Sequence, residues 1–386
     1  MGMEFMGYQR ADGRVGIRNH FLILPTVVCA VDVAQAIAKA LPGSVCAAHE
    51  SGCAAIIKSD RDCVERTLRG FATNPNVGAC LLVSLGCEDV DVRALAADIK
   101  RRGKPVRYLI IQETKGVTNT IREGIRIGLE MMEELSKQKR CKCDLADIVF
   151  GLECGGSDTT SGIAANPAIG LASDMLLAVG GTSIITETPE HIGGEQALTG
   201  RGETEEVREK FFAMIKFWEN MAEKNDTSLC NLSLGNLAGG LSTSEEKSLG
   251  CIMKAGTACI KQVVEYGEVP TEKGLIVMDG PGADLESLTG LAAAGAQVIV
   301  FSSGKGTPTG CPIVPVIKMT GNPQTYDNLE DCMDINAGRI ILGDATIAEI
   351  GQEIFDRMVA VCNGQRTKAE LLGFGGTSIM RRGFTY

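Results

Sequence analysis

The stretch "HFLILPTVV" (residues 20–28) is almost entirely apolar, and "DVAQAIAKAL" (32–41) follows it closely. The first is typical of a strand that is buried on both faces, whereas the second places apolar residues at helical spacing. A buried strand followed by a helix is the repeating unit of a parallel sheet. The alternation continues, with strands expected at 44–50, 78–86 and 106–113 and helices at 91–103 and 117–138.

The charged stretch "SKQKRCKCDLAD" (136–147) interrupts this alternation and marks the expected domain boundary. Beyond it we expect strands at 147–154, 181–187, 274–280, 296–304 and 312–319, and helices at 166–180, 203–224, 284–294 and 346–361. The glycine-rich stretch 231–250 has no periodicity, and we expect a functional site to order it. The sequence therefore predicts an α/β protein of two domains, 1–143 and 144–386, with mainly parallel, doubly wound, Rossmann-like sheets.

Composition narrows the classes of partner. The 386 residues are 44% hydrophobic and carry a net charge of −10, without a long basic run. This argues against binding to nucleic acid or to a membrane surface, but a small anionic substrate needs only a local positive pocket. No signal-peptide pattern and no apolar window of membrane-spanning length is present, so we expect a cytoplasmic protein.

Fifteen cysteines are many for a cytoplasmic chain, where disulfides are disfavoured. The absence of a C-x-x-C pair argues against a zinc knuckle or a thioredoxin-type site. Four cysteines lie at or just beyond the ends of predicted strands, where ligands collect in doubly wound sheets: Cys29, Cys53, Cys87 and Cys154. They can meet in one cleft and share a metal, with glycines that let backbone N–H groups approach. The alternative is a set of unrelated buried thiols.

Seven motifs resemble those of the altronate/galactarate dehydratase family, and the likeness runs from about residue 7 to 365. The motifs are "GYQRADGRVGIRNHFLILPTVVC" (7–29), "SLGCE" (84–88), "LECGGSDTTSGIAANPAIG" (152–170), "TETPE" (186–190), "GNLAGGLSTSEEKSLG" (235–250), "GKGTPTG" (304–310) and "MDINAGR" (333–339). The resemblance implies an iron-dependent hydro-lyase that converts a sugar acid to a 2-keto-3-deoxy acid. A more distant resemblance, to the large subunit of sulfolactate sulfo-lyase, implies release of sulfite from a sulfonated 2-hydroxy acid instead.

The resemblance also implies a partner. Single-chain dehydratases of this family carry an additional small β-rich SAF-type domain, which two-subunit relatives have as a separate polypeptide. This chain begins almost at "GYQRADGRVG", so we expect it to be the large subunit of a two-subunit enzyme, with a small SAF-domain subunit as partner. Whether it also forms a homo-oligomer stays open.

Dehydration requires removal of the proton α to a carboxylate, so positioned charge must stabilise the enolate that develops. We predict that Cys53, Cys87 and Cys154 hold a 4Fe–4S cluster with one open iron. The competing form is a mononuclear Fe²⁺ bound by a mixture of cysteine, histidine and carboxylate. Cys29 is a possible fourth ligand or a substitute. The sulfo-lyase subunits lack thiols that match Cys53 and Cys87, so the presence of both favours dehydration.

Three histidines narrow the search for a general base. His49 lies four residues before Cys53 at a predicted strand end, where it is either a catalytic residue or a structural hydrogen-bond donor. His20 opens a strand and is expected to be structural. His191 is expected to lie in solvent.

Other side chains complete the predicted site. Lys305 and Asp158 are the further catalytic candidates, with Lys254 and Lys318 as alternative bases, and helix capping is the alternative role of Asp158. Arg14 and Arg18 are candidates to bind the substrate carboxylate, unless they form ion pairs that pin the N-terminal segment. Polar contacts to the substrate are expected from Ser157, Thr159, Ser161, Asn236 and Thr307. Weaker signals come from strand-end acids and glycine-rich loops, at Glu113, Thr160, Glu187, Glu190 and Lys247.

Two further function classes are alternatives to the lyase. One is a nonenzymatic iron–sulfur protein on an α/β scaffold. The other, a nicotinamide dehydrogenase, lacks support because "PTVVCA" (25–30) stands where a G-x-G-x-x-G loop would follow the first strand.

Overall fold

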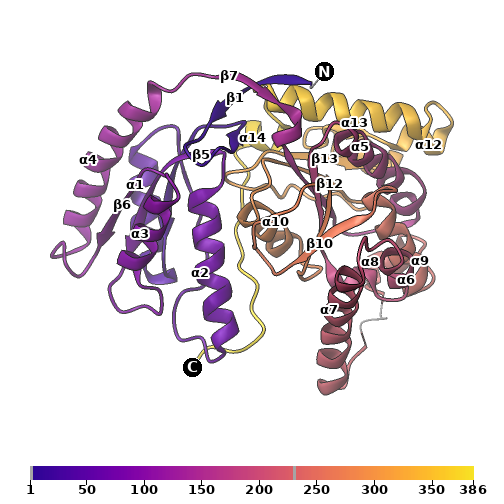
Figure 1. The fold of residues 1–386 in the computed structure, drawn as a ribbon, viewed down its shortest axis with the longest axis horizontal. Helices are drawn as coiled ribbons and strands as arrows, with labels where there is room; N and C mark the ends of the chain where they lie inside the picture. The colour runs from indigo at the N-terminus through magenta and orange to yellow at the C-terminus, as the bar shows by residue number, and fades with distance from the viewer. Residues whose placement is uncertain (1–2, 229–231) are drawn as a thin grey trace.

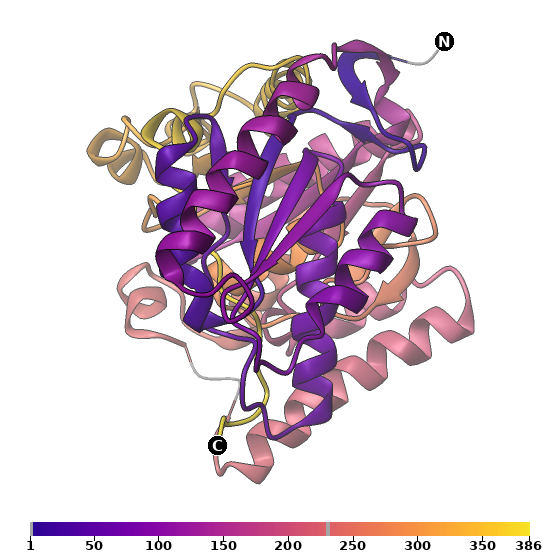
Figure 2. The same cartoon turned by 90° about the vertical axis from the view of Figure 1, so that its left-hand side faces the viewer.

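The computed structural model describes residues 3–228 and 232–386, which form two lobes side by side (Figure 1). The N-terminal lobe is built on a parallel four-stranded sheet of order β4-β3-β5-β6. Its strands are β3 (His20–Pro25), β4 (Ser44–Cys46), β5 (Val77–Ser84) and β6 (Val106–Ile110). One face is covered by α1 (Val31–Ala40) and α4 (Val117–Ser136), and the other by α2 (Lys58–Thr73) and α3 (Val92–Arg101), as Figure 2 shows.

Strand β3 shows why its sequence is continuously apolar. Successive side chains point to opposite faces of a sheet, so Phe21 and Ile23 join the core beneath α1 and α4. Leu22 and Leu24 join the core on the opposite face, beneath α2 and α3. All four are at most 1% exposed, as expected for a strand with helices on both sides.

The C-terminal lobe is built on a parallel seven-stranded sheet of order β10-β11-β9-β8-β12-β13-β14. The strands are β8 (Val149–Cys154), β9 (Thr182–Ile185), β10 (Ile260–Val264), β11 (Leu275–Met278), β12 (Val298–Ser302), β13 (Val316–Thr320) and β14 (Ile335–Asn336). From β8 the chain first builds the sheet outward in one direction, and from β12 it builds in the other. The switch point therefore lies between β8 and β12, where doubly wound sheets bind their ligands.

Helices pack on both faces of this sheet. On one face lie α5 (Asn166–Ala178) and α13 (Ile347–Cys362), and on the other α10 (Asp284–Ala293). The remaining helices are α6 (Glu195–Thr199), α7 (Glu205–Lys224), α8 (Leu234–Ala238), α9 (Ser244–Ile252), α11 (Pro323–Asn328), α12 (Gly338–Leu342) and α14 (Lys368–Leu372). None of the described helices is both long enough and apolar enough to cross a membrane.

The two lobes share one core, because α10 packs directly on α2. Gly70 of α2 lies so close to α10 that a Cβ there would stand 2.3 Å from the carbonyl oxygen of Ala293. The buried amide of Asn74 donates to the carbonyls of Ala292 and Ala296, at 2.8 and 3.0 Å. These contacts fix the lobes against each other and set the relative position of their functional loops.

Two terminal segments also join the lobes. The antiparallel sheet β2-β1-β7 pairs β1 (Glu4–Gln9) with β2 (Val15–Gly16) and β7 (Cys141–Asp144), so the predicted boundary after residue 143 falls inside β7. The C-terminal tail, yellow in Figure 1, runs down beside α2. Its Arg382 and Gly383 donate backbone N–H bonds to the Asp60 carboxylate, at 3.0 and 2.9 Å.

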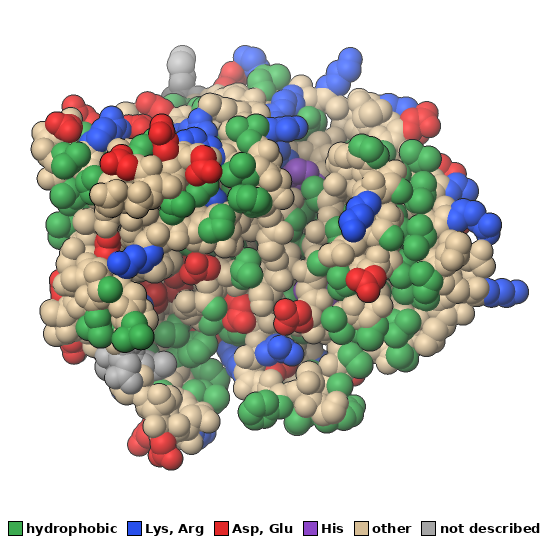
Figure 3. Space-filling model, turned by 180° about the vertical axis from the view of Figure 1, so that it is seen from behind, with side chains coloured by type: hydrophobic (Ala, Val, Ile, Leu, Met, Phe, Trp, Pro, Cys, Tyr) green, Lys and Arg blue, Asp and Glu red, His purple; other side chains and the backbone are tan. Residues whose placement is uncertain are grey.

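The predicted α/β class with parallel sheets is confirmed. Strand β10 and the small antiparallel sheet were not predicted. The stretch 231–250 contains the short helices α8 and α9, and its first residue, Asn231, lies outside the described residues. On the face seen in Figure 3, basic side chains are scattered among acidic ones, in line with the net charge of −10.

Candidate functional site

A buried group of thiols, carboxylates and one lysine lies at the switch point of the C-terminal sheet. Cys154 is the last residue of β8 and pairs in register with Ser302, the last residue of β12. Glu187 and Glu190 follow β9, and Glu190 stands in the 3₁₀ turn Thr188–His191. Cys251 comes from α9 and Lys254 from the turn directly after it. Three segments that are distant in sequence thus supply one cluster, which we call the Cys154 centre.

Three residues of the Cys154 centre have the spacing of metal ligands. Cys154, Glu190 and Cys251 place their ligand atoms within 4.8 Å of one another. The two sulfurs are 3.5 Å apart, and Oε2 of Glu190 lies 3.4 Å from the Cys154 sulfur and 3.0 Å from that of Cys251. Two thiolates on one tetrahedral ion with metal–sulfur bonds of about 2.3 Å stand about 3.8 Å apart. The donor set therefore fits a borderline-soft divalent ion such as Fe²⁺ or Zn²⁺.

Lys254 supplies positive charge inside this centre. Its Nζ donates to the Cys154 sulfur at 2.8 Å and forms an ion pair with Glu187, and the lysine is fully buried. Burial lowers the pKa of Lys254, but Cys154 and Glu187 outweigh that effect and raise the pKa well above its ordinary value. Lys254 is therefore a buried ammonium, which removes it as the neutral base that its sequence position allowed.

Glu187 has the properties of a base. Burial is the largest influence on its carboxyl group and raises its pKa to about 7, although Lys254 acts in the opposite direction. Oε2 accepts the backbone N–H of Cys154 at 3.1 Å, whereas Oε1 is buried without a hydrogen-bond partner among the described residues. The backbone φ of 71° is in the left-handed region that glycine favours, and such strain concentrates at functional sites.

Glu190 differs from Glu187 because it faces two lysines. Lys247 forms an ion pair with Oε1 at 2.9 Å. Burial raises the pKa of Glu190, but Lys247 and Lys254 together lower it by more, so the net shift is downward. Two neighbouring carboxyl groups are thus held in different protonation regimes, which is how acid–base sites commonly divide their roles.

His191 is buried, which corrects the expectation that it lies in solvent. Its ring packs against Phe211 with ring centroids 6.1 Å apart, and neither ring nitrogen has a hydrogen-bond partner among the described residues. Burial, and next the positive charge of Lys254, lower its pKa from 6.5 to about 3. His191 is therefore neutral in the folded protein at any moderate pH.

This neutral His191 predicts a loss of stability in acid. Between pH 6.5 and 3 the unfolded chain binds a proton at this residue and the folded chain does not, so the free energy of unfolding falls as the pH falls. From pH 6.5 to pH 5 the loss from this group is about 2 kcal/mol. His191→Phe keeps a ring against Phe211 and is expected to lose about 2 kcal/mol less than the wild type over that interval, measured by urea unfolding. Equal losses in the two proteins would contradict the assignment.

The glycine-rich loop after Cys154 is held by Asp158. Oδ1 of Asp158 accepts the hydroxyl of Thr160 at 2.6 Å and both the N–H and the hydroxyl of Ser161 at 3.0 and 3.2 Å. Oδ2 accepts the amide of Asn322 at 2.9 Å. These contacts favour the structural role that was the alternative for Asp158, because both of its oxygens are already used.

Helices α8 and α9 cover this loop. Asn236 of α8 donates its amide to the carbonyl of Ser157 at 2.9 Å, and the Thr159 hydroxyl donates to the carbonyl of Gly239 at 3.4 Å. A cavity of only about 10 Å³ remains between the loop and α9, with Ser157, Lys247 and Cys251 among its lining residues. This space holds at most one water molecule.

The other predicted thiols lie elsewhere. Cys53 and Cys87 are exposed on loops of the N-terminal lobe, together with Cys29, whereas Cys154 is 1% exposed. The structure thus places Cys154 with Cys251 and Glu190, and it places Cys53 with Cys29 and Cys87. The role of each as an iron ligand stays a prediction.

His49 and Arg18 make contacts that favour their structural alternatives. The two ring nitrogens of His49 are engaged, Nε2 with the carbonyl of Pro25 at 2.7 Å and Nδ1 with the N–H of Ser51 at 3.2 Å. The guanidinium of Arg18 binds the Glu370 carboxylate through two nitrogens, at 2.7 and 2.9 Å. Neither side chain is free to meet a substrate.

The remaining predicted residues, Arg14, Lys305 and Thr307, make contacts outside the Cys154 centre. Arg14 pairs with Asp12 at 2.7 Å and donates to the carbonyl of Thr73. Lys305 is exposed, and its backbone N–H donates to the carbonyl of Gly156 beside the glycine-rich loop. The Thr307 hydroxyl donates to that of Thr309 at 2.9 Å.

Cys251 is the functional residue that sequence reasoning missed, because it lies in a helical pattern where a thiol resembles core filler. Glu187 and Glu190 gave only weak strand-end signals. Lys318 is 1% exposed with an unpartnered Nζ, and burial lowers its pKa, but the contacts of the Cys154 centre do not include it.

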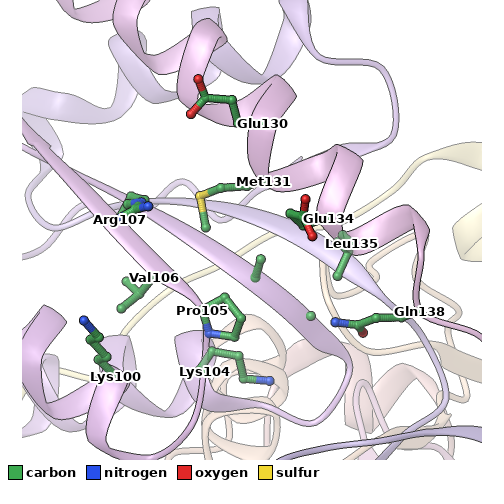
Figure 4. A pocket seen from close by; sticks show the side chains of 12 residues that line it. Lys100, Lys104, Pro105, Val106, Arg107, Glu130, Met131, Glu134, Leu135 and Gln138 are labelled. Atoms are coloured by element: carbon green, nitrogen blue, oxygen red, sulfur yellow. The ribbon is translucent and has the colours of Figure 1, made fainter.

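A larger cavity lies away from this centre. Figure 4 shows a pocket of about 380 Å³ that lies between α4 and the amino ends of β5 and β6, the opposite edge of the N-terminal sheet from its functional loops. Lys104 in this pocket donates to the backbone carbonyl of Asn74 at 3.1 Å, and the pocket contains no thiol. We therefore place the chemistry at the Cys154 centre.

Comparisons with known proteins show the family of this chain. Residues 145–385 match the family model "D-galactarate/Altronate dehydratase, C-terminal", and residues 7–136 match "D-galactarate dehydratase/Altronate hydrolase, second domain". The chain is 36% identical to (2R)-sulfolactate sulfo-lyase subunit beta of Chromohalobacter salexigens, over 96% of each chain. It is 35% identical to altronate dehydratase of Bacillus subtilis, over 99% of this chain and 78% of that one. It is 34% identical to galactarate dehydratase (L-threo-forming) of Escherichia coli, over 95% and 74%. The chain therefore belongs to the D-galactarate/altronate dehydratase family and is a carbon–oxygen lyase.

Proposed function

We propose that this chain is the catalytic subunit of a hydro-lyase that converts a sugar acid of the altronate or galactarate type to a 2-keto-3-deoxy acid. The observation that carries the proposal is the buried Cys154 centre, which combines two thiols, a free carboxylate oxygen and an ammonium at the sheet's switch point. Matches to dehydratases at 34–35% identity over 95–99% of the chain support the substrate class.

Iron is the proposed metal, held by Cys154, Glu190 and Cys251. The 3.5 Å sulfur–sulfur distance and the mixed thiol–carboxylate donors fit the mononuclear form of the predicted iron site. When bound there, a divalent iron supplies a Lewis acid for the carboxylate and hydroxyl oxygens of the substrate.

The chain's own residues divide the proton transfers. Glu187 takes the proton α to the carboxylate through Oε1, the oxygen that no described residue occupies. Its pKa of about 7 suits a general base near neutral pH. Lys254 contributes positive charge to the developing enolate and a proton to the departing hydroxide. Lys247, at the cavity wall, binds the carboxylate of the substrate.

A small SAF-domain subunit is part of the proposal. The sulfo-lyase relative is named as a subunit beta and matches this chain over 96% of its length, whereas the dehydratases extend beyond the matched region. A relative that is itself one subunit of its enzyme supports a partner for this chain. A cytoplasmic location stays a prediction.

Release of sulfite from a sulfonated 2-hydroxy acid is the second candidate function. The 36% identity to the sulfo-lyase subunit favours it, and both reactions need the same α-proton removal.

The test is to incubate the purified chain, alone and with the small subunit, with altronate, galactarate and sulfolactate, and to assay both 2-keto acid and sulfite. We expect 2-keto acid from a sugar acid. Sulfite release without sugar-acid turnover would transfer the assignment to the second candidate, and metal-dependent colour without turnover would favour a nonenzymatic iron protein.

Cys251→Ser is expected to remove the mononuclear iron. A serine oxygen is a poorer ligand for a soft site, so we expect affinity for Fe²⁺ to fall at least ~100-fold and turnover to fall with it. The measurement is the iron content after anaerobic loading with Fe²⁺ in the absence of sulfide, where the wild type should retain about one iron per chain. Cys259→Ser alters an exposed thiol nearby in sequence and serves as the control. Full iron retention by Cys251→Ser would exclude Cys251 as a ligand.

A further inference from the structure

Three exposed thiols of the N-terminal lobe form a second constellation, separate from the Cys154 centre. Cys29, Cys53 and Cys87 lie on the loops that follow β3, β4 and β5, and these strands are neighbours in the sheet order β4-β3-β5. All three thiols are free and exposed. Three cysteines therefore converge at one carboxyl edge, although their sequence spacing shows no metal-binding motif.

Backbone hydrogen bonds tie the three loops together. The N–H of Val28 donates to the carbonyl of Ser51 at 2.9 Å, and the N–H of Asp89 donates to the carbonyl of Gly52 at 3.1 Å. Val28 directly precedes Cys29, and Asp89 lies two residues after Cys87. Each bond therefore joins the segment beside one of these cysteines to the loop that carries Cys53. The thiols consequently stand on a framework with a fixed geometry.

Side chains reinforce this framework from below. Oε1 of Glu88 accepts the Thr26 hydroxyl at 2.6 Å, and Oε2 accepts the N–H of Gly86 at 2.7 Å, so one carboxylate joins the first and third loops. His49 joins the first and second through its contacts with Pro25 and Ser51. Glu88 and His49 thus form hydrogen bonds within the loops, whereas the three sulfurs remain available as metal ligands.

A glycine permits the close approach of two loops. Gly52 has φ +104, and a Cβ there would lie 2.3 Å from the carbonyl oxygen of Thr26. Only glycine fits this position, because the contact is with backbone and the conformation is one that L side chains rarely adopt. The residue directly before Cys53 thus brings its loop against the loop that leads to Cys29.

The spacing of the sulfurs indicates the kind of group that they can hold. Among the described residues, the three thiols do not form a group within 4.8 Å, the condition that the Cys154 centre meets for a single ion. They are nevertheless close enough to interact: burial has the largest effect in raising the pKa of Cys53, and Asp89, Cys29 and Cys87 raise it further. In a 4Fe–4S cubane each cysteine binds a different iron. The cysteine sulfurs therefore stand on the order of 6 Å apart, farther than the sulfurs that share a single ion.

We propose that Cys29, Cys53 and Cys87 bind a 4Fe–4S cluster through three of its irons, with the fourth iron open to an oxygen ligand. Cys154 is not part of this site, because it belongs to the buried centre of the other lobe. The proposal therefore assigns two metal centres to one chain, a mononuclear ion in the C-terminal lobe and a cluster in the N-terminal lobe.

The test is anaerobic reconstitution of the full chain with Fe²⁺, sulfide and a thiol reductant. Iron and acid-labile sulfide are then counted, and visible absorption and electron paramagnetic resonance are recorded. Cys154→Ser provides the background, since it disables the mononuclear site and leaves the three loops intact. We expect about four irons and four sulfides per chain in this background.

Three variants in that background locate the cluster. Cys29→Ser, Cys53→Ser and Cys87→Ser are each expected to lose most of the sulfide and the visible absorption. Cys141→Ser and Cys259→Ser, which alter exposed thiols outside the three loops, are expected to retain both. Circular dichroism and thermal unfolding establish that each variant is folded.

Three results would overturn the proposal. The first is uptake of iron without sulfide, and the second is sulfide retained by any of the three loop variants. The third is an equal loss of sulfide in the two control variants. Lyase activity is measured separately, on chain loaded without sulfide as well as with it. A cluster without turnover would refute the proposed function and leave this inference standing, whereas turnover without a cluster would do the reverse.

Discussion

Glu187→Gln is expected to lower kcat/KM for the sugar acid about 1,000-fold or more, while the chain still binds its metal. The amide keeps an oxygen for the backbone N–H of Cys154, so the loop after β9 is held as before. It cannot accept the α-proton, because an amide is not a base at neutral pH. The loss should appear in kcat more than in KM, since proton removal belongs to the chemical step.

The pH profile tests the same assignment. Burial raises the pKa of Glu187 to about 7, and a base must be deprotonated to act, so wild-type kcat/KM is expected to rise as the pH increases through about 7. The small residual activity of Glu187→Gln should lack this rise. Activity within tenfold of the wild type, or an unchanged pH limb, would show that another group takes the proton.

Glu190→Gln is the matched comparison, because it makes the same change three residues away in the same turn. Glu190 contacts both sulfurs and is a proposed ligand, so its variant should lose iron and activity together. Glu187→Gln should lose activity and keep iron. If both variants lose iron equally, Glu187 acts through metal binding rather than as the base.

The alternation of strands and helices was predictable because it depends on local patterns. Strand β3 is apolar on both faces, and α4 has regular helical spacing, so each could be recognised without its neighbours. Helix α2 has a weaker local signal, because its sequence, "KSDRDCVERTLRGFAT", is rich in charge and includes glycine. Its buried positions make sense only once α10 is packed against it, at the close approach of Gly70. That contact joins residues more than 200 positions apart.

The site residues, too, divide into those that a local pattern predicts and those that only the folded chain brings together. Cys154 was found because it ends a predicted strand, and strand ends collect ligands. Its partner Cys251 gave no signal, since its function arises from the docking of α9 against the loop after β8. The strand-end rule also identified Cys29, Cys53 and Cys87, but it could not say whether thiols of different lobes meet. The rule gives the edge of a sheet, and only the packing of two sheets shows whether their edges meet.

The role of Arg18 could be chosen only from its contacts in the folded chain. As a cation before the first strand of the sheet, it fitted a substrate carboxylate and an ion pair equally well. The folded chain satisfies it with the Glu370 carboxylate and with the carbonyls of Ile17, Val361 and Gln365. Glu370 and these carbonyls, apart from that of Ile17, come from residues about 340–350 positions later, so no local pattern could reveal them.

Arg18→Met is therefore expected to lower the free energy of unfolding by about 3–5 kcal/mol, because it leaves the Glu370 carboxylate and several buried carbonyls without their donor. The side chains of Arg18 and Glu370 are only 10% and 18% exposed, so water replaces little of the lost interaction. Urea unfolding at neutral pH measures the change, and KM for the sugar acid is measured on the folded fraction. Arg126→Met, which breaks exposed ion pairs on α4, should change the free energy of unfolding little and serves as the control. A large increase in KM with unchanged stability would instead make Arg18 a substrate ligand, and the contacts with Glu370 would then have to open during turnover.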